Sequence, residues 1–106
     1  MNLMPWLVLL LVVVLPLSSC DKLKASWLIT RGNTAYNNGN MDGAIALYEE
    51  ALRINPDFVD IHWSLGTAYY GKGDTFNVEK QIFILKKNGK KDLAENLQKL
   101  LDDVSQ

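Results

Sequence analysis

The chain has 106 residues, with 11 basic and 12 acidic side chains, one histidine and one cysteine, and a net charge of −1. A nearly neutral chain gives no indication of nucleic-acid binding or of a strongly charged partner. A single cysteine excludes a disulfide framework and a thiolate metal cluster. All charged side chains follow residue 20. The sequence therefore divides into an uncharged leader and one small polar domain.

The leader is an apolar run from Trp6 to Leu15, bracketed by Pro5 and Pro16. An apolar run of roughly 10–14 residues is typical of a signal-peptide core, whereas a helix that spans a bilayer needs about 20. Because proline disfavours helix, we expect extended backbone over residues 17–20, as a processing enzyme requires.

The leader ends in Leu17-Ser18-Ser19-Cys20, which resembles the lipobox of bacterial lipoproteins. The resemblance implies a signal peptide over residues 1–19, a diacylglyceryl group and palmitate on Cys20, and a short tether over residues 20–24. No other cofactor is expected. The domain would then lie on the membrane and face the periplasm. Asp21 resembles a retention signal for the inner membrane, and the outer membrane is the alternative.

A second interpretation of the leader is an uncleaved N-terminal membrane anchor. No lysine or arginine precedes the apolar run, whereas Lys22 and Lys24 follow it. Under the positive-inside rule this charge distribution favours a cytoplasmic location for the rest of the chain. Both interpretations stay open on the sequence.

After the leader, similar residues recur at an offset of 34, as in the pairs Gly32/Gly66, Tyr36/Tyr70 and Gly39/Gly73. A period of 34 residues with two helices in each unit is typical of the tetratricopeptide repeat. The residues that carry this resemblance are Gly32, Gly39, Ala44, Tyr48, Ala51 and Pro56, then Leu65, Gly66, Tyr69, Gly73 and Asp74. The resemblance implies an all-α, right-handed solenoid fragment, with repeats at 25–58 and 59–87 and a C-terminal capping helix within 88–106.

Five helices are expected in the mature domain, at Ala25–Asn38, Asp42–Ile54, Val59–Lys72, Phe76–Lys87 and Lys91–Asp103. Glycines 39 and 73 are expected to end helices in a left-handed conformation, with Asn88-Gly89 as a further stop. N-caps are expected at Asn40 and Asp74, and also at Asp57 ahead of the third helix, with Asp60 in its first turn. Gly32 and Gly66 should let the second helix of each pair approach closely.

The last predicted helix is strongly amphipathic, with Leu93, Leu97 and Leu101 on one side. It resembles the helix that closes arrays of this family. About three repeats are normally needed for a stable array, so two repeats and one capping helix stand near the limit. A partner, or a homo-oligomer, would then contribute to stability.

The family resemblance implies binding of a protein or peptide along the concave surface formed by the first helix of each pair. The residues in these positions are Ile29, Asn33, Tyr36, Asn37, Trp63, Thr67, Tyr70 and Gly71. Amphipathic aromatic side chains favour such contacts, but Tyr36 and Tyr70 fit a purely structural role as well. Two function classes remain: a membrane-tethered adaptor of the cell envelope, and a structural subunit assembled through its last helix.

An enzyme or a metal site is not expected. The only histidine, His62, lacks nearby metal-ligand residues in the sequence, and no phosphate loop, nucleophile elbow or carboxylate pair is present. The lysines at 86, 87, 90 and 91 are interpreted as solvated residues at a helix end.

Overall fold

The computed structural model describes the backbone of residues 4–105 and the side chains of residues 19–105. This part of the chain contains five helices and no strand, which confirms the all-α prediction. The helices are α1 (Met4–Asn37), α2 (Met41–Ile54), α3 (Ile61–Gly71), α4 (Thr75–Lys87) and α5 (Lys91–Val104). Apart from the start of α1, their bounds lie within two residues of those predicted.

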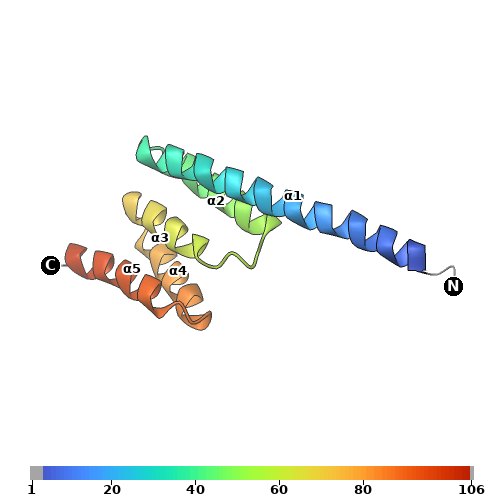
Figure 1. Ribbon diagram of the computed structural model, residues 1–106. Helices are drawn as coiled ribbons and strands as arrows, with labels where there is room; N and C mark the ends of the chain where they lie inside the picture. The colour runs from blue at the N-terminus through green and yellow to red at the C-terminus, as the bar shows by residue number, and fades with distance from the viewer. Residues whose placement is uncertain (1–3, 106) are drawn as a thin grey trace.

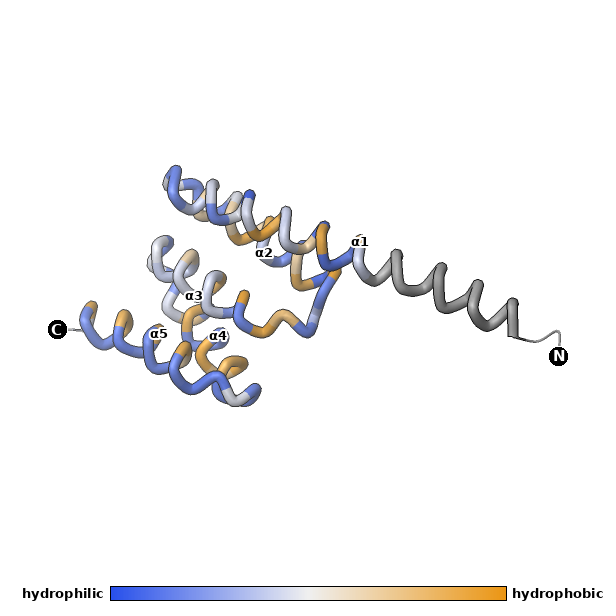
Figure 2. The backbone as a smooth tube through the Cα atoms, in the orientation of Figure 1, coloured by the Kyte–Doolittle hydropathy of each residue, from blue (hydrophilic) through white to orange (hydrophobic). Residues whose placement is uncertain are grey.

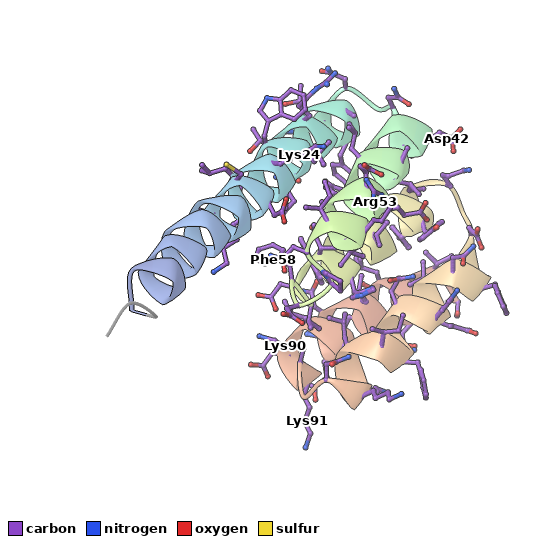
Figure 3. All side chains as sticks on the ribbon, turned by 90° about the vertical axis from the view of Figure 1, so that its right-hand side faces the viewer. Lys24, Asp42, Arg53, Phe58, Lys90 and Lys91 are labelled. Atoms are coloured by element: carbon purple, nitrogen blue, oxygen red, sulfur yellow. The ribbon has the colours of Figure 1, made fainter. Side chains whose placement is uncertain are left out.

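The helices pack as successive antiparallel pairs in two layers. α1 packs on α2, α3 packs on α4, and contacts between α2 and α3 join the two pairs. α5 packs on both α4 and α3. Figures 1 and 3 show α1 and α5 on one side of the molecule and α2 and α4 on the other, with α3 between α1 and α5. The result is a short solenoid fragment of the kind that two helical repeats build.

Helix α1 is longer than predicted. It was expected to begin at Ala25, after extended backbone over residues 17–20, but it is helical from Met4 and continues through Pro16 and Cys20. A proline removes one backbone donor, and an apolar segment still pairs its other backbone groups best as a helix. Figure 1 shows this part of α1 extending past α2, which makes the molecule long and narrow, at 71 × 29 × 17 Å. Among the described residues, no helix has the length and apolar character needed to cross a membrane.

The turns within each pair follow the predicted pattern. Gly39 and Gly73 have φ angles of +79° and +75°, in the left-handed region that favours glycine. The side chain of Asn40 then accepts a hydrogen bond of 2.9 Å from the backbone N–H of Gly43. These two features confirm the predicted ends of α1 and α3 and the first predicted N-cap.

The turn between the two pairs differs from the prediction. Asp57 does not cap α3, because that helix begins at Ile61 and its N-cap residue is Asp60, whose side chain makes no capping hydrogen bond. The carbonyl oxygen of Asp57 instead accepts from the backbone N–H of Val59 at 2.9 Å. Short-range backbone hydrogen bonds after Pro56 form a turn there, so α3 begins two residues later than predicted.

The core consists of two clusters that meet at α3. The first joins α1, α2 and α3 and contains Ala25, Leu28, Ala44, Ile45, Tyr48, Ala51, Ile61, Leu65 and Ala68. The second joins α4 and α5 and contains Val78, Ile82, Leu85, Ala94, Leu97 and Leu101. Figure 2 shows apolar positions recurring among polar ones along α5, as expected for a helix that closes a core on one side.

The two repeated glycines have different neighbours. At Gly32 the neighbour is the ring of Tyr48 on α2, the second helix of the same pair, as predicted. At Gly66 the neighbour is the side chain of Leu97 on α5, and not a residue of α4. The residue of α4 that corresponds to Tyr48 is Ile82, which is smaller, so a leucine from α5 fills the space.

Candidate protein-binding face

The seven predicted binding residues all lie on α1 or α3 and form what we call the α1–α3 face. None of them is fully buried. Ile29, Asn33, Tyr36 and Asn37 come from α1, and Trp63, Thr67 and Tyr70 come from α3. Gly71, also predicted for this surface, is the last residue of α3 and is exposed.

Tyr36 and Tyr70 occupy equivalent positions on α1 and α3 and have the same environment. Each is half-buried, with the ring of Tyr36 against the first core cluster and that of Tyr70 against the second. Of the four tyrosine hydroxyls, those of Tyr48 and Tyr69 are hydrogen-bonded within the described part of the chain, and those of Tyr36 and Tyr70 are not. Two fixed rings with unused hydroxyl groups therefore remain available to a ligand.

A groove adjoins Tyr70, where the ends of α3 and α5 and the start of α4 come together. Its volume is about 760 Å³, and its lining includes Tyr70, Thr75, Leu101 and Val104. It combines apolar side chains with a tyrosine hydroxyl and the exposed backbone of the turn after α3, so it can accept an amphipathic side chain from another protein.

Asn33 is held in place by a buried tyrosine. The hydroxyl of Tyr48 donates a hydrogen bond of 2.5 Å to Oδ1 of Asn33. Burial, and secondarily the neighbouring Tyr36, raise the pKa of Tyr48 above its ordinary value. The hydroxyl stays protonated and keeps donating, so the exposed Asn33 side chain is oriented by a contact that the sequence did not reveal.

Trp63 differs from the other residues of the face because its indole N–H is hydrogen-bonded to a residue of α5. Its indole Nε1 donates a hydrogen bond of 2.8 Å to Oδ1 of Asn96, and its ring packs on the second core cluster. Thr67 likewise donates its hydroxyl within α3, to the carbonyl oxygen of Ser64 at 2.8 Å. A contact between either residue and a partner stays a prediction.

Two polar contacts between the helix pairs were missed by sequence reasoning. The hydroxyl of Tyr69 donates to Glu49 on α2 at 3.0 Å, and Lys72 forms an ion pair of 2.5 Å with Asp42. Burial, followed by the hydrogen bond with Glu49, raises the pKa of Tyr69 to about 12. Because the partners lie 20 or more residues apart, only the fold brings them together. Both contacts join α2 to α3 or to its C-terminal end.

His62 lies between helices and takes part in an internal contact. Its Nδ1 lies 2.6 Å from Oε1 of Gln81, which is the only polar residue among those buried in the described structure. No group of three or more histidine, cysteine or acidic side chains that could hold a metal ion occurs in the described residues. The contact satisfies the buried amide of Gln81, which is a structural role.

Residues 32–73 match the family model described as TPR repeat. The match begins at Gly32 in α1, covers all of α2, and ends just after α3. A search of curated protein sequences finds no match to the chain. The family match supports a protein that contains a tetratricopeptide repeat. Such repeats generally mediate protein–protein interactions, and proteins of this family are typically scaffolds without catalytic activity.

Proposed function

We propose that this chain is an adaptor of the bacterial cell envelope, which binds a partner protein or peptide through the α1–α3 face while a lipid on Cys20 holds it to a membrane. The proposal for the tether is supported by the apolar leader, by Ser18-Ser19-Cys20, and by the exposure of the Cys20 thiol. A periplasmic location on the inner membrane is part of the proposal, on the basis of Asp21. The outer membrane, and an uncleaved anchor in place of the lipid, are the alternatives.

The observation that carries the binding proposal is the pair of half-buried tyrosines, Tyr36 and Tyr70. Each presents a fixed ring and a hydroxyl without a hydrogen-bond partner among the described residues, at the same position of two successive helix pairs. Rigid amphipathic side chains of this kind are enriched where proteins bind one another, because they add contact area at a small cost in conformational entropy.

A photo-cross-linking experiment tests this face. A photoreactive amino acid replaces Tyr36, Tyr70 or, as a control, Lys87, which is exposed on α4. Adducts of the same mass from positions 36 and 70, and none from position 87, are expected. Adducts from position 87 alone, or from no position, would reject the α1–α3 face as the binding surface.

A second candidate function is that of a structural subunit in an envelope complex or a homodimer. The sequence suggested α5 for this role, and Val104 at its end is 63% exposed. Phe76 and Phe83 on α4 are more exposed still, at 74% and 66%, and seven residues apart they share one face of that helix. If this candidate is correct, the chain is a dimer by sedimentation, and Phe83→Ser makes it a monomer.

A further inference from the structure

Residues on the outer side of α1 form a stripe that begins at the proposed lipid site. Leu23, Lys24, Trp27 and Arg31 follow Cys20 at intervals of three, four, seven and eleven residues. With 3.6 residues per turn, these positions lie within roughly 60° of Cys20 around the helix axis. All five residues are exposed. We call this set of residues the outer stripe.

The outer stripe lies on a side of α1 away from the two core clusters. At its edge Lys24 comes near α2, where its charge adds to the hydrogen bond from Arg53 in lowering the pKa of Glu50. Ala25, Leu28 and Gly32, which contact α2 and the first core cluster, occupy another side of α1, roughly 115° from the stripe at 3.6 residues per turn. Leu23 is 71% exposed and Trp27 is 56% exposed, so two large apolar side chains are mostly open to solvent in the described structure. Water is an unfavourable environment for such side chains, which favours a second, less polar surface over them.

The chemistry of the outer stripe fits the boundary between lipid and water. The guanidinium of Arg31 lies over the ring of Trp27, 4.8 Å from its centroid. A tryptophan with its apolar ring and polar N–H is enriched at the headgroup level of bilayers, and arginine and lysine pair there with phosphate groups. The charged residues of the outer stripe, Lys24 and Arg31, are both basic. The charge therefore complements an anionic surface.

We propose that the outer stripe lies on the bilayer, with Leu23 and Trp27 at the headgroup boundary and Lys24 and Arg31 on the phosphates of anionic phospholipids. The proposal rests on the proposed lipid attachment at Cys20, and it extends that attachment from a point to one side of a helix. The apolar run Trp6–Leu15 belongs to the same helix, which makes the stripe continuous with the leader if the leader is retained.

A second copy of the chain is a poorer fit to the outer stripe. A stable interface buries about 800 Å² on each partner, with a largely apolar centre. Two apolar side chains flanked by Lys24 and Arg31 do not supply such a centre, and in a symmetric dimer of this stripe neither basic residue would meet an acidic one. A lipid surface requires neither a large area nor shape complementarity.

Contact between the outer stripe and the membrane leaves the α1–α3 face open. Asn33 and Asn37 of that face lie on a different side of α1, their mean direction roughly 115° from that of the stripe at 3.6 residues per turn. A partner would approach along the membrane surface. The orientation of the domain, and not only its tether, would thereby determine which proteins it meets.

Quenching of Trp27 fluorescence in vesicles tests this proposal. The full chain is purified from membranes as a Trp6→Phe, Trp63→Phe variant, in which Trp27 is the only tryptophan. It is reconstituted into vesicles of phosphatidylglycerol and phosphatidylcholine with brominated acyl chains. We expect the brominated lipid to quench Trp27 and the bilayer to protect it from aqueous acrylamide. In a variant that also carries Lys24→Glu and Arg31→Glu, both the lipid quenching and the protection from acrylamide should fall severalfold.

A matched control places the reporter on another exposed aromatic position. In a variant that also carries Trp27→Phe and Phe83→Trp, the tryptophan on α4 should be quenched by acrylamide and not by brominated lipid. The α4 control and the Trp27 reporter differ only in their place on the molecule. Equal lipid quenching at both positions would indicate unspecific contact and would overturn the proposal.

The intact mass of the same preparation separates failure of this inference from failure of the tether. If the mass includes the lipid but acrylamide quenches Trp27 freely, the outer stripe does not lie on the bilayer, although the tether is correct. If the mass lacks the lipid, the proposed attachment at Cys20 fails. Protection of Trp27 from both quenchers would point to a second copy of the chain and would also overturn the proposal.

Discussion

The backbone of Gly32 lies directly against the ring of Tyr48, so that a Cβ atom added at position 32 would lie 2.6 Å from Cε1 of that ring. This contact sets the spacing between α1 and α2. It also holds the Tyr48 hydroxyl against Asn33 on the α1–α3 face. A packing requirement and the orientation of a proposed binding residue therefore depend on the same two residues.

Gly32→Ala should destabilise the protein. The ring of Tyr48 is buried and cannot move aside, so the added methyl group should lower the free energy of unfolding by about 1–3 kcal/mol. Gly71→Ala is the matched control. There the nearest atom is Sδ of Met41, at 3.0 Å, at the end of a flexible side chain. Thermal unfolding followed by circular dichroism compares the two, and equal melting temperatures would contradict the role given to Gly32.

Leu97→Ala tests whether α5 is an integral part of the core. Leu97 is fully buried and fills the space next to Gly66. Its truncation should lower the free energy of unfolding by about 2–5 kcal/mol. Val104→Ala, on an exposed position of the same helix, should change it by no more than about 0.5 kcal/mol. Similar denaturant midpoints for the two variants would mean that α5 does not close the second core cluster.

Lowering the pH should destabilise the N-terminal end of α4, because it protonates the capping carboxylate of Asp74. A hydrogen bond from the Asn77 side chain, then one from the Asn77 backbone N–H, lower the pKa of Asp74 below its ordinary value of 3.8. A lowered pKa in the folded state gives a stabilising contribution that is complete above pH 3.8 and is lost as the pH falls through the folded-state pKa.

Asp74→Asn isolates this acid effect, because asparagine keeps the cap without titrating, as Asn40 does in the first pair. Melting temperatures are measured for both proteins from about pH 5 to about pH 2. The unmodified protein should lose more stability over this range than the variant. Parallel curves would show that Asp74 has no part in the loss.

Alkali should weaken the contact between α2 and α3 through Tyr69. Burial and the hydrogen bond with Glu49 raise its pKa from 10.0 to about 12. Since the folded state keeps the proton that the unfolded state has lost, stability should fall as the pH rises from 10.0 to about 12. Phenolate absorbance in Glu49→Gln should show one tyrosine ionising at lower pH than in the unmodified protein. No difference between the two titrations would exclude the Glu49 contact.

Local sequence signals predicted most of the fold. Gly39 and Gly73 marked the helix ends because few other residues adopt a positive φ angle, and Asn40 marked a helix start because its side chain caps the backbone. The same signals fail between the pairs. Aspartate is a favoured N-cap residue, which made Asp57 a candidate. Backbone hydrogen bonds in the turn after Pro56 instead place the start of α3 at Ile61.

Contacts that join distant residues were not predictable in the same way. The bond from Trp63 to Asn96 and the packing of Leu97 on Gly66 depend on how α5 turns over α3, which no local pattern specifies. The helical continuation of α1 through Pro16 was missed because proline was treated as a stop. All seven candidate binding residues, which were assigned from the family resemblance, do lie on α1 and α3.

We propose that a lipid on Cys20 holds this pair of helical repeats to a membrane. Labelling of cells with a palmitate analogue, followed by isolation of the protein, tests it most directly, with Cys20→Ala as the control. We expect label on the unmodified chain, none on the variant, and a mature N-terminus at residue 20. An unlabelled chain that retains its leader would contradict the claim.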